Sequence, residues 1–169
     1  MAIRTILHYP DKRLRNPGAK IEKVTPEIKQ LVEDMAETMY AAPGVGLAAT
    51  QIGEAVSLFV IDIAEQDEPS DLRVFINPEI LEREEEITWT EGCLSFPGVT
   101  EDVDRAAKVK VRALDRNGKS FTLEAEGLLA VAIQHEFDHL EGVLMIDHLG
   151  PLKKRLVHRK MQKRADASA

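Results

Sequence analysis

The sequence predicts an α+β fold in which antiparallel strands pack around a buried central helix, with one helix N-terminal and another C-terminal to them. Three observations support this class. A helical pattern comes first, several β-type runs follow without intervening helices, and a strongly apolar helical pattern precedes a basic segment. The 169 residues contain no apolar run near the roughly 20 residues that cross a bilayer, so we expect one non-membrane domain over 1–169.

The first helix is expected at about residues 26–41. Thr25 offers an N-cap hydroxyl, and Pro26 suits the first helical position. Apolar residues then recur at helical spacing, namely Ile28, Leu31, Val32, Met35 and Met39. Pro43 stops the helix, and the glycine-containing segment 44–51 is expected to be irregular chain.

Apolar, β-branched runs at 57–63, 73–81 and 86–95 predict strands. Two further runs, 108–114 and 120–127, alternate apolar and polar residues on either side of an Asp-Arg-Asn-Gly turn. This pattern predicts a β-hairpin. Its inner face is expected to hold Val109, Val111, Phe121 and Leu123.

The buried central helix is expected at about 124–140. Its apolar residues surround most of the helix axis: Leu128, Leu129, Val131, Ala132, Ile133, Phe137 and Leu140. A helix that is apolar on most sides is usually enclosed by the rest of the protein. Gly142 is well placed to terminate it.

Residues 150–169 are expected to form a basic C-terminal helix that begins at Pro151. The segment 151–169 has seven basic residues against Asp166, a net charge of +6, while the remainder of the chain carries −13. Such a segment can contact RNA or an acidic partner locally, or it can be a solvated helix face. A thin apolar stripe of Leu152, Leu156 and Met161 is expected to attach it.

The buried helix contains the pentad His-Glu-x-x-His. His135 and His139 are four residues apart, so both imidazoles project from one face and can reach a common metal ion. Glu136 lies one step round the helix, where it can reach a water on the metal. Burying two histidines and a glutamate costs several kcal/mol unless they are paired or coordinated. The pentad therefore predicts a divalent metal site.

The third ligand does not follow the common protease patterns. Met145 stands where one pattern has a histidine, and the only later glutamate, Glu141, is just two residues on. His148 and His158 lie beyond the end of the helix and are interpreted as surface residues. Cys93 is the better candidate for the third ligand. It is the single cysteine and therefore cannot form an intrachain disulfide. The alternative is that it is only a small buried apolar residue, as a lone cysteine often is. Three protein ligands would leave a position open for water, as in catalytic sites.

Three segments taken together resemble the motifs of the peptide deformylase family. They are Gly44-Val45-Gly46-Leu47-Ala48-Ala49-Thr50-Gln51, Glu91-Gly92-Cys93-Leu94-Ser95 and Gln134-His135-Glu136-Phe137-Asp138-His139. The resemblance extends over nearly the whole chain. It implies that metal-activated water removes the N-formyl group from the N-terminal methionine of newly synthesised polypeptides and releases formate.

The same resemblance implies a role for individual residues. The metal ligands would be Cys93, His135 and His139; Glu136 would be the general acid/base; and the Gln51 amide and the Leu94 N–H would donate to the formyl oxygen. The implied substrate-binding residues, for which core packing is the alternative, are Val45, Gly46, Trp89, Glu91, Leu128, Val131 and Ala132.

The resemblance favours Fe(II) as the single divalent ion, and zinc, nickel or cobalt also suits the Cys-His-His donor set. The implied partners are N-formyl-methionyl nascent peptides, with ribosome contact through the basic C-terminal helix as a further hypothesis. We see no apolar leader-like run before Pro10, so we expect a cytoplasmic location in a bacterium.

Three other functions compete with this interpretation. Nucleotide binding by the glycine segment would need a strand before it and a helix after it, the reverse of the predicted order. A metallopeptidase of broader specificity shares the pentad. A binding protein with a structural zinc would normally supply four protein ligands, and only three are identified here.

Overall fold

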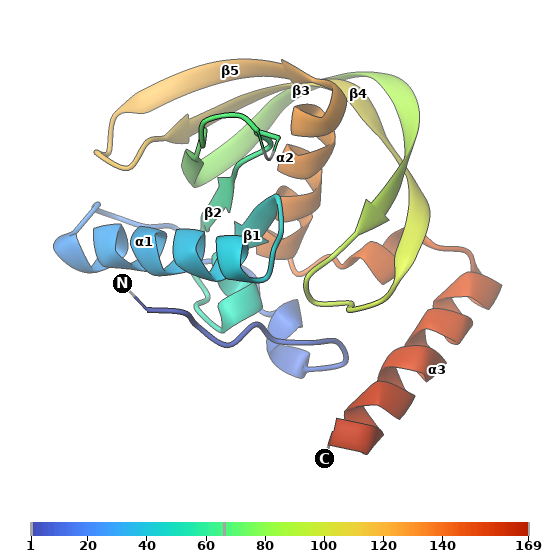
Figure 1. Cartoon of the computed structure of the whole chain (residues 1–169). Coiled ribbons are helices and arrows are strands. Elements are labelled where there is room, and N and C mark those ends of the chain that lie inside the picture. The colour runs from blue at the N-terminus through green and yellow to red at the C-terminus, as the bar shows by residue number, and fades with distance from the viewer. Residues whose placement is uncertain (1, 66, 169) are drawn as a thin grey trace.

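The computed structural model describes residues 2–65 and 67–168, which form three α-helices and one antiparallel sheet (Figure 1). The expected α+β class is confirmed. The helices are α1 (Pro26–Ala41), α2 (Gly127–Leu140) and α3 (Pro151–Ser168). The five strands pair in sequence order and are β1 (Gly46–Ala48), β2 (Leu58–Ile61), β3 (Arg73–Gly92), β4 (Thr100–Leu114) and β5 (Ser120–Glu126). Short 3₁₀ helices are η1 (Lys12–Arg15), η2 (Ala49–Ile52) and η3 (Met145–His148).

Helix α1 has the predicted bounds because its N-terminal signals are present in the structure. Thr25 Oγ1 accepts a hydrogen bond of 3.3 Å from the Ile28 N–H, and Pro26 occupies the first turn. The predicted apolar stripe faces the sheet, where Met35 and Met39 are fully buried against residues of β1 and β2. Helix α1 thereby supports one end of the sheet.

The strand boundaries differ from the prediction in the middle of the chain. One continuous strand, β3, replaces the two strands expected at 73–81 and 86–95. Its central glutamates are exposed and interrupt the apolar pattern, yet the backbone stays paired with β4 through two register shifts. Strand β4 begins at Thr100 rather than 108, and the segment expected to be irregular contains the short strand β1.

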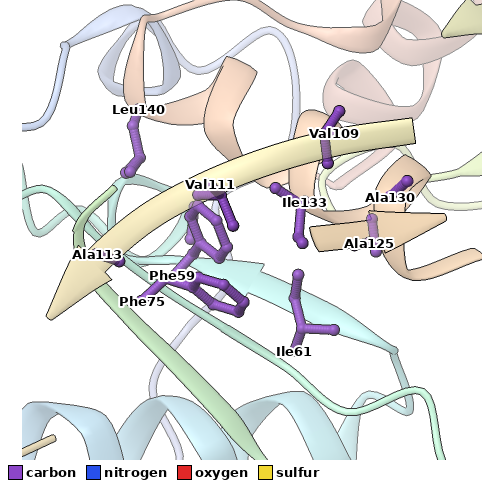
Figure 2. Packing of buried hydrophobic residues seen from close by; sticks show 12 residues of the cluster. Phe59, Ile61, Phe75, Val109, Val111, Ala113, Ala125, Ala130, Ile133 and Leu140 are labelled. Carbon is purple, nitrogen blue, oxygen red and sulfur yellow. The ribbon is translucent and has the colours of Figure 1, made fainter. Parts of the chain in front are cut away.

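Helix α2 begins three residues later than expected because Glu124, Ala125 and Glu126 belong to β5. It ends at Leu140, and Gly142 follows in a left-handed conformation with φ of 74°. Figure 2 shows the buried cluster on one side of α2, where Ile133 and Leu140 pack with side chains of β2, β3 and β4. This packing fixes the position of α2 relative to the sheet.

The apolar contact of α3 is not the predicted stripe. Leu152 and Leu156 are 65% and 52% exposed, whereas Val157 and Met161 are buried. The contact face is therefore rotated around the helix, and only Met161 of the predicted stripe belongs to it. Among the described residues, no helix combines the length and apolar character that crossing a bilayer requires.

Candidate metal centre and active site

Two elements bring three potential metal ligands together. Helix α2 carries His135 and His139, and Cys93 follows the last residue of β3. Their ligand atoms all lie within 4.8 Å of one another, with Cys93 Sγ 3.4 Å from His139 Nε2. Sulfur and nitrogen ligands of one tetrahedral zinc ion lie roughly 3.3–3.6 Å apart. The Cys93–His139 distance lies in this range, and one sulfur with two imidazoles is a donor set that suits a divalent transition metal.

The surroundings of these groups also fit a bound cation. His139 Nδ1 and Glu136 Oε1 are buried and have no hydrogen-bond partner among the described residues. Burial lowers the pKa of His139 well below its ordinary value, so the ring is neutral, which is the form that binds metals. Burial raises the pKa of Glu136 to about 7, a value suited to exchanging protons near neutral pH.

A chain of buried charges holds His135. Its Nδ1 lies 2.8 Å from Glu91 Oε1, and Glu91 accepts two hydrogen bonds from Arg105, of 2.7 and 2.9 Å. Arg105 also donates to Asp138 at 2.6 Å, and His148 Nε2 lies 2.8 Å from the same carboxylate. Burial would raise the pKa of Glu91, but hydrogen bonds from Arg105 and His135 outweigh it and lower that pKa. The ionised Glu91 therefore accepts a hydrogen bond from the Nδ1–H of His135, which leaves the other ring nitrogen free to bind a metal.

Gln51 lies on η2 and is 1% exposed. Its Oε1 accepts a hydrogen bond of 2.9 Å from the Ala48 N–H, so its amide nitrogen points the other way, toward Cys93 Sγ at 3.7 Å. Leu94 follows Cys93 directly and contributes to the same cavity as Gln51. The two residues expected to bind the formyl oxygen thus both lie next to Cys93 and line the same cavity.

The cavity has a volume of about 730 Å³ and contains most of the predicted site. This size is within the roughly 300–1,000 Å³ of pockets that enclose small ligands. Strand β3 supplies one wall of the cavity and α2 supplies another. Val45 and Leu128 are partly exposed apolar side chains that also line the cavity. All of the predicted substrate-binding residues line it: Val45, Gly46, Trp89, Glu91, Leu128, Val131 and Ala132.

Comparison with known proteins identifies the family of this chain. A family model described as polypeptide deformylase matches residues 3–155. The chain belongs to the polypeptide deformylase family. Family members named peptide deformylase include one from Azotobacter vinelandii, 54% identical over 96% of both chains. Another, from Alkalilimnicola ehrlichii, is 52% identical over 96% of this chain and 91% of its own.

Solved structures of deformylases have the same fold. The crystal structure of a peptide deformylase from Legionella pneumophila superposes with a TM-score of 0.92 and 47% identity, covering 99% of this chain and 98% of that one. A peptide deformylase from Ehrlichia chaffeensis, in complex with actinonin, gives a TM-score of 0.92 and 37% identity over 97% and 98% of the two chains. Shared fold and sequence thus extend over the whole deformylase domain of these relatives.

Some residues of this deformylase-family cavity had no signal in the sequence. Ile6 and His8 of the N-terminal segment line it, as does Arg164 of α3. The N-terminal segment reaches the site through backbone hydrogen bonds between residues far apart in sequence, such as Leu7 N–H to Gln51 O at 2.7 Å. No local pattern encodes such a pairing. His139, in contrast, follows from the His-Glu-x-x-His spacing, but it is not among the lining residues.

Proposed function

We propose that this chain removes the formyl group from the N-terminal methionine of newly made polypeptides, acting as one metallohydrolase domain over residues 1–169. Membership of the deformylase family supports the reaction. The observation that carries the chemistry is the convergence of Cys93, His135 and His139 within 4.8 Å, next to a cavity that Glu136 lines.

In this proposal α2 is the catalytic helix, since it carries both histidines and Glu136. Cys93, His135 and His139 would hold one divalent cation, with Fe(II) favoured by family resemblance and zinc, nickel or cobalt compatible with the same donors. When bound, such a cation supplies a Lewis acid that lowers the pKa of a water to about 7.

Glu136 would move the proton. Its buried carboxylate lines the cavity and has one oxygen without a partner among the described residues. It can accept a proton from the attacking water and return it to the amine of the departing methionine. The pKa near 7 that burial gives Glu136 suits both steps.

Gln51 and Leu94 would stabilise the oxygen of the formyl group as negative charge develops on it. The amide nitrogen of Gln51 is held on the cavity side by the Ala48 N–H, and the Leu94 backbone N–H would be the second donor. Loss of one such donor typically lowers kcat by 10²- to 10³-fold.

The apolar wall would receive the methionine side chain. Leu128, Val131 and Ala132 occupy successive turns of α2 on the face that also carries His135 and Glu136. Trp89 and Glu91 lie on one face of β3, because side chains two residues apart in a strand share a face. A single helix face therefore connects methionine binding with the reacting groups.

The experiment compares formate release from formyl-Met-Ala with peptide-bond cleavage of unblocked peptides. Formate release without cleavage is the expected result, and cleavage without formate would instead favour a broader metallopeptidase. Glu136→Gln should retain the metal and lose turnover, whereas Glu141→Gln, an exposed glutamate just beyond α2, should behave as wild type. An active Glu136→Gln protein would refute the proton transfer.

We also propose that α3 contacts ribosomes, where formylated chains emerge, in the cytoplasm of a bacterium. Its support is the +6 charge of 151–169. Because α3 contributes buried Val157 and Met161, a truncation would also remove core contacts. Replacing exposed Arg155 and Arg159 by glutamine is the cleaner test, and unchanged ribosome co-sedimentation at low salt would contradict the proposal.

A further inference from the structure

Ser95 ends the segment that carries Cys93, and the proposed mechanism gives it no role. Its side chain is completely buried, and its hydroxyl oxygen lies 3.0 Å from Gln51 Nε2. Its backbone is held as well, since the Ser95 carbonyl accepts from the Tyr9 N–H at 2.9 Å and the Phe96 N–H donates to Cys93 O at 2.9 Å. The hydroxyl is therefore presented to Gln51 at a fixed position.

The carboxamide of Gln51 is held at both ends. Its Oε1 accepts from the Ala48 N–H, which excludes the flipped amide because two donors would then face each other. One Nε2 proton goes to Ser95 Oγ, and the remaining proton is directed to the side where Cys93 Sγ lies at 3.7 Å. The terminal torsion of a glutamine has no strong preference of its own, so these partners determine where that proton points.

We propose that Ser95 is a positioning residue for the Gln51 donor. It occupies one Nε2 proton and so turns the second one into the cavity beside Cys93. Without the hydroxyl, the carboxamide would keep its bond at Oε1 and only the long contact of 3.7 Å from Nε2 to Cys93 Sγ, and its nitrogen could move away from the position of the formyl oxygen. The inference rests on the proposed role of Gln51 in deformylation, and it extends the site by one buried residue.

A double-mutant cycle on the metal-loaded protein tests this coupling. Ser95→Ala should lower kcat for formyl-Met-Ala roughly 10-fold, less than the 10²- to 10³-fold expected for removing the donor itself. KM and metal content should change little, because the substrate side chain and the metal ligands are untouched. In a Gln51→Ala background the same Ser95→Ala change should alter kcat by less than about twofold, since the residue it positions is gone.

Thr38→Val is the matched control. The Thr38 hydroxyl is also buried, accepting from the Arg4 N–H at 2.8 Å and donating to Asp34 O at 2.7 Å, but it lies on α1 and does not line the cavity. Its removal should lower the melting temperature as Ser95→Ala does and leave kcat unchanged. An equal kcat loss from Ser95→Ala in both backgrounds, or no loss in either, would overturn the positioning role.

A second readout does not depend on turnover. In zinc-loaded, ¹⁵N-labelled protein the side-chain Nε2 proton resonances of Gln51 should shift in Ser95→Ala and stay in place in Thr38→Val. Unshifted resonances in Ser95→Ala would overturn the inference. Failure of the wild-type protein to release formate would instead contradict the proposed function, so the two failures are distinguishable.

Discussion

Gly46→Ala tests whether the position of the Glu136 carboxylate controls the rate. A Cβ at Gly46 would lie 2.7 Å from Glu136 Oε2 and 3.1 Å from its Cδ and Cγ. Ordinary contact begins at 3.4 Å, so the carboxylate would have to move about 0.7 Å. Misplacing a catalytic group by about 1 Å can lower the rate roughly 10²-fold. We therefore expect kcat to fall about 10- to 100-fold, with metal content unchanged.

The assay is formate release under saturating formyl-Met-Ala, with a melting curve and metal analysis of the same preparation. Gly150→Ala is the control, because a Cβ there meets nothing within 4 Å. Gly44→Ala gives a graded comparison: its Cβ would press on the flexible end of the Leu94 side chain, so its effect should be smaller. A Gly46→Ala protein with wild-type kcat and normal stability would refute the claim that this close approach positions Glu136.

Three further predictions concern stability. Arg105→Leu should lower the free energy of unfolding by about 3–5 kcal/mol in urea titrations, because it removes the guanidinium that pairs with the buried Glu91 and the partly buried Asp138; a loss below about 1 kcal/mol would contradict this. The pKa of Asp34 lies below its ordinary 3.8, because hydrogen bonds, of which that from Gln30 is the largest cause, outweigh the effect of burial. The difference in unfolding free energy between wild type and Asp34→Asn should thus be largest above about pH 5 and should decline as the pH falls through the pKa of Asp34 in the folded protein. A difference that does not depend on pH would refute this linkage. Met161→Ala should cost about 2–5 kcal/mol and Leu156→Ala less than about 0.5 kcal/mol, and the reverse order would contradict the observed face of α3.

Local signals predicted the parts of the fold that depend on short-range physics. Thr25 and Pro26 set the start of α1, and Gly142 follows the end of α2 in the conformation that glycine favours. The length of β3 could not be predicted from its apolar residues, because its exposed central glutamates are kept in the strand by pairing with β4. Pairing between distant segments decided that boundary, and hydropathy did not.

The candidate site was predictable where spacing alone constrains geometry. His135 and His139 had to share a helix face, but nothing in the spacing required Cys93 to approach them. Exclusion of the other candidate ligands favoured Cys93, and the resemblance to the family implied it as a ligand. Asp138 and His148 show the limit most clearly. Asp138 of α2 and His148 of η3 both enter the charge network beside Arg105 of β4, and no local sequence pattern connects these three elements.

The most direct test of the account is the coordination of the metal. X-ray absorption of the zinc-loaded protein should show one sulfur at about 2.3 Å and two imidazole nitrogens at about 2.0–2.1 Å from the ion. The sulfur contribution should disappear in Cys93→Ser. A first shell of nitrogen and oxygen alone in the wild-type protein would mean that Cys93 does not join His135 and His139 around one cation, and the proposed catalytic centre would be wrong.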